Sequence, residues 1–346
     1  MITLGDVAKK AGVSSSTVSI VVNNRQVPGV SVSAATRERV LQVARQMGYT
    51  PNSLARAMAT GKNRVFAIVK EELVSEIGSR ILNGAQQESA RANYLVKPFQ
   101  LNEPDAALEL VQSCLSQRVA GMILVNLPDA VVDVFCREAQ LASVPVVMVD
   151  DLPRNRAGLQ ITSDNRGGVR QMCEFLLKAG HREIGFIGGP EESWVSQERK
   201  RYFRETLAEH GLSVPDEFVA DACWARHDIV EPAVARMLDP AREKRPTALF
   251  CAGDAIAMMA IRAARKLGYA LPWDLSVTGF MNATYSYLSD PSLTTVGQDF
   301  EEMARIGVRY LEGCAAGQMP PLSDEIVRVP TKLVVRESVA GVRGQA

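Results

Sequence analysis

The sequence lacks the features that mark several large classes of protein. No apolar run in its 346 residues is long enough to span a bilayer, and the first residues hold no apolar segment of the signal-peptide kind. The six cysteines are scattered without a C-x-x-C pair, and the three histidines stand apart from one another. We therefore expect a cytoplasmic protein with reduced thiols and with neither a metal site nor a cofactor.

Catalytic and nucleotide-binding motifs are also missing. Gly185–Gly189 is rich in glycine but contains neither G-x-G-x-x-G nor the P-loop Gly-Lys-Ser/Thr, so we interpret it as the end of a strand. Asp150 and Asp151 are adjacent, and neighbours on a strand point to opposite faces, which disfavours joint acid–base chemistry. Because no Ser-His-Asp or Cys-His set is evident either, the sequence does not predict an enzyme.

The net charge is zero overall, but the charges are unevenly distributed. Residues 1–64 hold nine Lys/Arg against two acidic residues, a surplus of seven positive charges that residues 65–346 must balance. A basic segment on an acidic body is expected when only that segment meets nucleic acid. A solvated charged face would be the alternative if the segment held no DNA-binding motif.

Residues 2–19 have the pattern of a helix, a glycine turn and a second helix. Leu4, Val7 and Ala8 lie at helical spacing on one face, and Gly12 supplies the turn. Ser14 is a good N-cap for the second helix, which leaves small hydroxyl side chains at its exposed N-terminal end. Such an end presents hydroxyls and free backbone N–H groups to a DNA phosphate or base edge.

A third helix and a short fourth one are expected to follow. Ser33 is the predicted N-cap of the third helix, whose apolar stripe and terminal glycine are Val40, Val43, Ala44, Met47 and Gly48. Asn52 can then cap a helix of about two turns that stops at Gly61, and so short a helix is marginal alone in water. We expect it to form only when a partner copy and DNA pack against it.

From Val65 onward, short apolar runs alternate with helical segments. Strands are expected at 65–69, 121–125, 144–150, 183–189, 248–252 and 276–280, with helices at 79–92, 167–178 and 255–267. Unbroken apolar strands with helices between them are typical of βαβ units, so the body is predicted to be α/β with doubly wound sheets.

The chain resembles the lactose/galactose repressor (LacI/GalR) family of bacterial transcription regulators. In residues 1–62 the matching motifs are Thr3-Leu4-x-Asp6-Val7-Ala8, Ala11-Gly12-Val13-Ser14, Ser16-Thr17-Val18-Ser19, Thr36-Arg37-Glu38-Arg39-Val40 and Gly48-Tyr49-x-Pro51-Asn52-x-Leu54-Ala55. Further on they are Asp164-Asn165-x-x-Gly168, Gly180-His181-Arg182-x-Ile184-x-Phe186-Ile187-Gly188-Gly189, Pro246-Thr247-Ala248, Leu275-Ser276-Val277-x-Gly279-Phe280 and Val334-Val335-Arg336-Glu337-Ser338.

The resemblance implies a division of the chain into three parts. A helix-turn-helix head would take residues 1–48, and a hinge helix with its linker residues 49–62. The body, residues 65–340, would consist of two doubly wound α/β subdomains of periplasmic-binding-protein type, joined by three crossovers. The N-subdomain would cover about 65–163 and 297–325, and the C-subdomain about 164–296 and 326–340.

The resemblance also implies a function. The chain would be a homodimeric repressor that binds a pseudo-palindromic operator, because one head covers only a half-site. A small-molecule effector in the cleft between the subdomains would change their angle, and the hinge helix would fold or melt in response. The tail, residues 340–346, has no heptads, so no tetramerising coiled coil is expected.

The family pattern assigns the DNA contacts. Base contacts fall to Ser15 and Ser16, and phosphate contacts hold the register. The residues expected at the DNA are Thr3, Ser14, Ser15, Ser16, Thr17, Ser19, Ile20, Asn23, Asn52, Ala55 and Met58. Ile20 stands where the family usually has a guanine-reading Arg, and Met58 where it has a Leu wedge that opens the central base step. The loop 24–31 is also longer than usual.

The family resemblance also implies which residues line the effector site. The expected lining residues are Ile77, Asn126, Asp150, Arg199, Trp224, Asp254 and Met281. Trp224 can stack on a ligand ring or pack in the core, and Asp254 can contact the ligand or cap the helix that begins near Ala255.

Three departures from the family pattern affect this cleft. Residues 75–78 replace an Asn-Pro-Phe-Phe-like segment, Met281 replaces an Asp, and Gly253 replaces an Asn. The last two remove hydrogen-bond partners for the hydroxyls of a sugar. We therefore predict an effector that is less polar than a hexose or differently charged.

Two other interpretations remain open at this point. The cleft can be degenerate, with a protein as co-effector in place of a small molecule. A solute-binding protein is the alternative from another class, but it would need an export signal and would have no use for the head.

Overall fold

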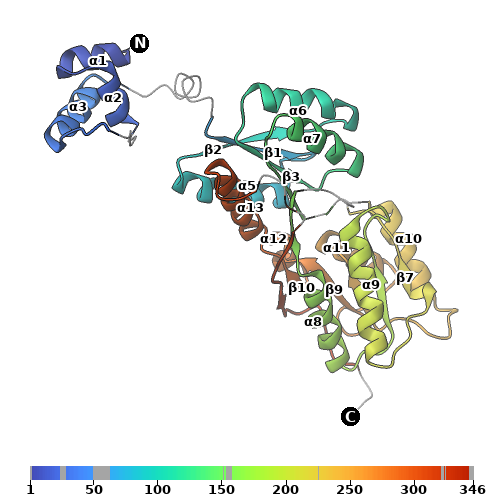
Figure 1. Cartoon of the computed structure of the whole chain (residues 1–346). Helices are drawn as coiled ribbons and strands as arrows, with labels where there is room; N and C mark the ends of the chain where they lie inside the picture. The colour runs from blue at the N-terminus through green and yellow to red at the C-terminus, as the bar shows by residue number, and fades with distance from the viewer. Residues whose placement is uncertain are drawn as a thin grey trace. The chain divides into compact units, whose positions relative to one another are not determined.

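The computed structural model describes residues 2–23, 29–49, 63–150, 152, 158–224, 226–320, 323 and 325–342 (Figure 1). The chain forms two compact units, Met1–Arg64 and Val65–Ala346. Among the described residues, no helix combines the length and the apolar character needed to cross a membrane.

The first unit contains α1 (Leu4–Ala11), α2 (Ser15–Val22) and α3 (Ala34–Gln46). Their inner faces share one small core, made of Val7, Ala8, Ala11, Val18, Val21, Val40 and Ala44. The predicted N-caps Ser14 and Ser33 are confirmed, since the side chain of each accepts a hydrogen bond from the backbone N–H three residues on. Gly12 ends α1 with φ of +64°, a left-handed conformation that favours glycine.

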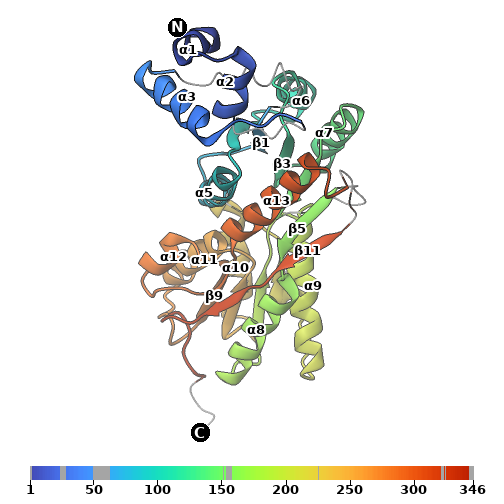
Figure 2. The same cartoon turned by 60° about the vertical axis from the view of Figure 1, so that its left-hand side comes forward.

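The first lobe of the second unit is built on a parallel sheet with the strand order β11-β5-β4-β3-β1-β2. The strands are β1 (Val65–Lys70), β2 (Leu95–Gln100), β3 (Gly121–Val125), β4 (Val146–Val149), β5 (Leu159–Ser163) and β11 (Ile326–Val329). One face packs against α5 (Glu76–Arg91) and α13 (Phe300–Ala315), and the other against α6 (Ala107–Ser116) and α7 (Asp129–Leu141). Both views show α5 and α13 side by side (Figures 1 and 2).

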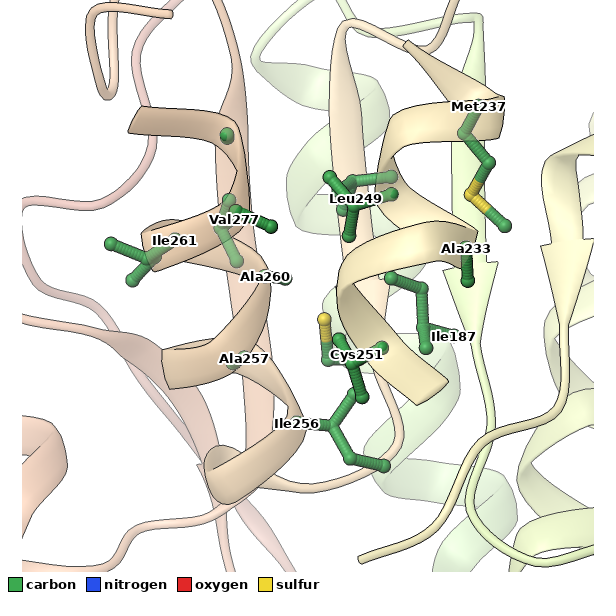
Figure 3. Close-up of a cluster of buried hydrophobic side chains, with 14 of the residues drawn as sticks. Ile187, Ala233, Met237, Leu249, Cys251, Ile256, Ala257, Ala260, Ile261 and Val277 are labelled. Carbon is green, nitrogen blue, oxygen red and sulfur yellow. The ribbon is translucent and has the colours of Figure 1, made fainter. Parts of the chain in front are cut away.

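The second lobe repeats this plan with the strand order β12-β10-β9-β8-β6-β7. Its strands are β6 (Ile184–Ile187), β7 (Val219–Ala220), β8 (Ala248–Cys251), β9 (Ser276–Met281), β10 (Thr294–Gly297) and β12 (Lys332–Val334), of which only the β10–β12 pairing is antiparallel. One face packs against α8 (Asn165–Lys178) and α9 (Trp194–Glu209). The other face packs against α10 (His227–Met237) and α11 (Asp254–Lys266). Figure 3 shows the buried hydrophobic side chains that form the cluster on this face. A short helix, α12 (Thr284–Leu288), follows β9.

The chain passes between the lobes three times, after β5, after β10 and after β11. These crossings are bonded to one another. The backbone N–H of Asp164 donates to the carbonyl of Val329 at 2.8 Å, and the Thr331 hydroxyl donates to the carbonyl of Asp164 at 3.2 Å. Because β11 pairs with β5, the last crossing follows Val329 and not residue 325, the boundary expected from the sequence.

The predicted fold class is confirmed: a helical head precedes two doubly wound α/β lobes. Each expected strand is present to within a few residues, and Gly185 lies inside β6 as the glycine-rich segment predicted. Six strands were not predicted from the sequence: β2, β5, β7, β10, β11 and β12. The residues of β2 are mostly exposed, and β7 is only two residues long. The prediction of a hinge helix after Asn52 lies outside the described residues.

Candidate functional site

The N-terminal end of α2 presents a group of small hydroxyl side chains. Ser14 Oγ accepts from the backbone N–H of Thr17 at 3.2 Å and lies 2.8 Å from Ser16 Oγ and 2.9 Å from Thr17 Oγ1. Ser15 and Ser16 are exposed, and Thr17 is half-buried. Since the first N–H groups of a helix have no partner inside it, this end offers hydroxyl and amide donors to an acceptor such as phosphate.

The remaining predicted DNA contacts in the head have identifiable local roles. Thr3 caps α1, with its backbone N–H donating to the Asp6 carboxylate at 2.8 Å and its hydroxyl accepting from the Asp6 N–H at 3.3 Å. Asn23 donates its side-chain N–H to the carbonyl of Ser19 at 2.9 Å, which ties down the last turn of α2. Ile20 is half-buried on the same helix. Asn52, Ala55 and Met58 lie outside the described residues.

In the body, the predicted residues of the first lobe meet at the carboxyl ends of its strands. Asn126 follows β3 and donates its side-chain N–H to Asp150 Oδ2, 3.0 Å away after β4. Gln298, on the second crossing, donates to Asp150 Oδ1 at 3.3 Å and to Ser163 Oγ at 2.8 Å. Asp150 is only 4% exposed, so the amide donors of Asn126 and Gln298 replace the water that its carboxylate lost on burial.

Lys70 lies at the same edge, as the last residue of β1. The residue is 8% exposed. Burial lowers the pKa of the Lys70 ammonium, and the nearby Asp150 carboxylate opposes that shift. The edge therefore holds one buried cation and one buried anion.

Arg199 of α9 is the central polar group at the corresponding edge of the second lobe. It is 3% exposed, and its guanidinium stacks 3.8 Å above the ring of Phe280. Its Nε donates to Asn165 Oδ1 at 2.8 Å, and Nη1 donates to the carbonyl of Ala252 at 2.7 Å. These contacts hold the guanidinium in one orientation at the carboxyl end of β8.

Asp254 does not cap α11, so that alternative for this residue is wrong. The N-cap position is Gly253, and the cap makes no side-chain hydrogen bond. The Asp254 carboxylate instead accepts from the backbone N–H of Ala283 at 2.8 Å and from the Thr295 hydroxyl at 2.5 Å. Burial raises its pKa, and the Thr295 hydrogen bond opposes that shift. At 1% exposure, this carboxylate fixes the loop after β9.

Trp224 is half-buried and contacts both hydrophobic clusters of the second lobe. Its ring covers two glycines: a Cβ on Gly189 would come within 2.6 Å of the indole, and one on Gly253 within 3.2 Å. Gly253, where the family pattern has Asn, therefore makes room for the ring. The core-packing interpretation of Trp224 holds for its covered face, and the rest of the side chain is accessible.

Ile77 and Met281 are both half-buried against the core of the first lobe. Met281 belongs to β9 of the second lobe, so its side chain crosses between the lobes. Next to Ile77, the Glu76 carboxylate accepts from the backbone N–H of Thr284 at 2.9 Å, another contact between lobes. Met281, in place of the usual Asp, thus contributes an apolar contact instead of an acceptor.

Several residues at this site were not found from the sequence. Lys70, Gln298 and Asn165 all follow or end strands at the edge where the lobes meet. Ligands of open α/β sheets bind at the carboxyl ends of the strands, so a charged residue closing an otherwise apolar strand was the available signal for Lys70. Among the described residues, no group of three or more His, Cys, Asp or Glu gathers as a metal site would require.

A helix-turn-helix joined to a pair of α/β lobes defines the class of regulators that couple DNA binding to a ligand. Comparison with known families agrees with this class. The model of the family "Bacterial regulatory proteins, lacI family" matches residues 3–52, and that of the "Periplasmic binding protein-like domain" matches residues 173–339.

Individual relatives are similar over nearly the whole chain. The transcriptional repressor CytR of Escherichia coli K12 is 29% identical over 323 residues, covering 91% of this chain and 90% of CytR. Catabolite control protein A of Priestia megaterium is 26% identical over 339 residues, covering 97% and 99%.

Solved structures give the same result. The lac repressor dimer bound to operator and the anti-inducer ONPF superposes with a TM-score of 0.81 at 27% identity, covering 98% of this chain and 99% of that one. The regulator CelR in complex with cellobiose gives 0.71 at 29% identity, covering 98% and 100%. The chain belongs to the LacI family: it is a DNA-binding transcriptional repressor with a periplasmic-binding-protein-like effector domain, in a family of regulators rather than enzymes.

Proposed function

We propose that the chain acts in the cytoplasm as a homodimer that represses transcription from a pseudo-palindromic operator, under the control of a small-molecule effector. The observation that carries the DNA part is the exposed hydroxyl cluster at the start of α2. Its geometry suits a recognition helix whose N-terminal residues contact base edges. The lac repressor dimer supports this proposal, because that relative was solved on its operator.

The effector part is supported by the buried polar edges of the two lobes. Asn126, Asp150 and Gln298 form one hydrogen-bonded group, and Arg199 with Asn165 forms a second. In these groups, Asp150, Arg199 and Asn165 are each more than nine-tenths buried. Polar groups that are held in place in this way can orient a ligand. CelR, a relative of similar fold, was solved with cellobiose.

In vitro selection from random duplex DNA with the full chain tests the DNA part. We expect enrichment of two inverted half-sites, each bound through one α2 helix. Ser16→Ala should weaken binding to the selected site, whereas Ser31→Ala, at an exposed serine outside α2, should leave it unchanged.

Two results would contradict this part of the proposal. One is enrichment of a single half-site or of no site. The other is an equal loss of affinity in both serine variants.

A further inference from the structure

Lys70 is a cation at the proposed effector site that lacks a direct partner among the described residues. It ends β1, and alternation along the strand puts it on the same face as Phe66 and Ile68, the face covered by α5 and α13. No described residue forms a hydrogen bond or an ion pair with its ammonium. Most of the residue is buried, which lowers the pKa of the Lys70 ammonium, and no described side chain replaces the water that the ammonium lost on burial.

Asp150 does not serve as a direct counter-ion. The carboxylates of Asp150, Glu71 and Glu72 attract the ammonium through space, which raises the pKa of Lys70 against the lowering by burial, but none of them forms an ion pair with it. The two oxygens of Asp150 are instead occupied by the side-chain N–H groups of Asn126 and Gln298. Asp150 is therefore satisfied by neutral donors, and the ammonium of Lys70 is left with all three of its N–H groups to offer.

A second donor on the opposite lobe is also unused. The side-chain Nδ2 of Asn165 is buried and has no hydrogen-bond partner, although Oδ1 of the same amide accepts from Arg199. Buried polar groups without partners are rare in folded proteins and indicate a missing partner. Asn165 Nδ2, like Lys70, can only donate.

The acceptors that would balance these donors are few. Met281 and Gly253 carry no side-chain acceptor, and the Asp254 carboxylate is committed to Ala283 and Thr295. Among the described residues of the two lobe edges, the Asp150 and Asp254 carboxylates are already bonded to neutral donors, and none of the carboxylates near Lys70 forms an ion pair with it. The missing component is a group rich in acceptors that carries negative charge.

We propose that Lys70 is a specificity-determining residue and that the effector carries a carboxylate or phosphate group, whose oxygens accept hydrogen bonds from the Lys70 ammonium. The inference rests on the proposed effector site and adds the chemical class of its ligand. Charge-assisted hydrogen bonds of this kind are the strong ones in proteins, and they also remove the cost of the bare ammonium.

The test compares full-length wild type with Lys70→Met, which keeps the length of the side chain and removes its charge. Lys178→Met, at an exposed lysine at the end of α8, is the matched control. Titration calorimetry uses three probe sets: glucose, gluconate and glucose 6-phosphate; ribose, ribonate and ribose 5-phosphate; and adenosine with its 5′-monophosphate.

We expect wild type and Lys178→Met to bind an anionic member of one set about ten- to a hundredfold more tightly than its neutral counterpart. Lys70→Met should lose that preference. Whether the preferred anion is the acid or the phosphate ester identifies the source of the charge. Binding of neutral probes alone, binding of no anionic probe, or a preference that survives Lys70→Met would overturn the proposal.

Thermal unfolding without any probe supplies a second readout. Removing an unsatisfied buried charge should leave the melting temperature of Lys70→Met equal to or above that of wild type. A large decrease would show that Lys70 is the counter-ion of Asp150 and would contradict the proposal. Operator binding by Lys70→Met is measured in parallel: if even wild type selects no operator, the proposed function fails, independently of the ligand class.

Discussion

The carboxylate of Glu76 accepts hydrogen bonds from the backbone N–H of Thr284, at 2.9 and 3.0 Å, and from the Thr284 hydroxyl at 3.3 Å. Glu76 is the first residue of α5 in the first lobe, and Thr284 is the first residue of α12 in the second. A carboxylate is favourable at the N-terminus of a helix. The contact therefore holds the two lobes together beside the proposed effector site.

Glu76→Ala should free the start of α12 and loosen the contact between the lobes. The amide N–H of Thr284 loses its acceptor, so we expect it to exchange with solvent at least about tenfold faster, the effect of losing one charge-assisted hydrogen bond. Hydrogen–deuterium exchange of the full chain measures this rate. Glu72→Ala, four residues away at an exposed position, should not change it, and unaltered exchange in Glu76→Ala would show that the contact does not persist in solution.

Gly84→Ala should destabilise the first lobe. Gly84 of α5 faces α13 so closely that a Cβ there would lie 2.7 Å from Glu301 Cα and 2.9 Å from its carbonyl carbon. Because both neighbours are backbone atoms, the helices must move apart, at a typical cost of about 1–3 kcal/mol. Denaturant unfolding should show this loss, while Asn83→Ala, at the exposed neighbouring position, should leave stability nearly unchanged. An unchanged midpoint for Gly84→Ala would contradict the close packing of α5 on α13.

Stability should fall as the pH drops below the ordinary pKa of histidine. His181 is buried, its Nδ1 lies 2.8 Å from the Thr247 hydroxyl, and its Nε2 lies 3.0 Å from the Ala340 carbonyl. Burial lowers the pKa of His181 in the folded protein, so below about pH 6.5 the unfolded chain takes up a proton first. The contribution of neutral His181 to the stability of the folded protein is therefore fully present above that pH and decreases below it.

His181→Gln should reduce this pH dependence. We expect its melting temperature to change less than that of wild type between about pH 7.5 and pH 5.5, although it is lower at neutral pH. His227→Gln, at an exposed position, should follow the wild-type profile. A His181→Gln profile parallel to that of wild type would assign the pH dependence to other groups.

Ile20 should set the base preference of the half-site. An isoleucine cannot read guanine by paired hydrogen bonds, whereas its methyl groups can contact a thymine methyl. Selection with wild type should therefore show no guanine requirement opposite Ile20, and Ile20→Arg should introduce one. A wild-type site that already demands guanine at that position would contradict this assignment.

The sequence predicted those features that depend on neighbours along the chain. The apolar run 121–125 became β3 without change, and the caps Ser14 and Ser33 lie where the side-chain chemistry placed them. β2 was not predicted, because this edge strand contains Lys97 and Pro98 and therefore has no apolar run.

The residues of the candidate effector site could be predicted only in part from the sequence. Asp150 and Arg199 were named from the family pattern, but their partners were not, because those partners come from distant parts of the chain. Gln298 is 148 residues from Asp150, and Thr284 is 208 residues from Glu76. Local sequence patterns do not predict such distant pairs. The role proposed for Lys70 could therefore be inferred only from the structure around it.

The central claim is that ligand binding between the lobes controls DNA binding by the head. The most direct test is the affinity of the full chain for its selected operator, measured by fluorescence anisotropy with and without each anionic probe and its neutral counterpart. The account predicts a pseudo-palindromic site whose affinity changes several-fold with an anionic probe in wild type and in Lys178→Met, but not in Lys70→Met. The same affinity with every probe would contradict it and would favour a degenerate site or a protein co-effector.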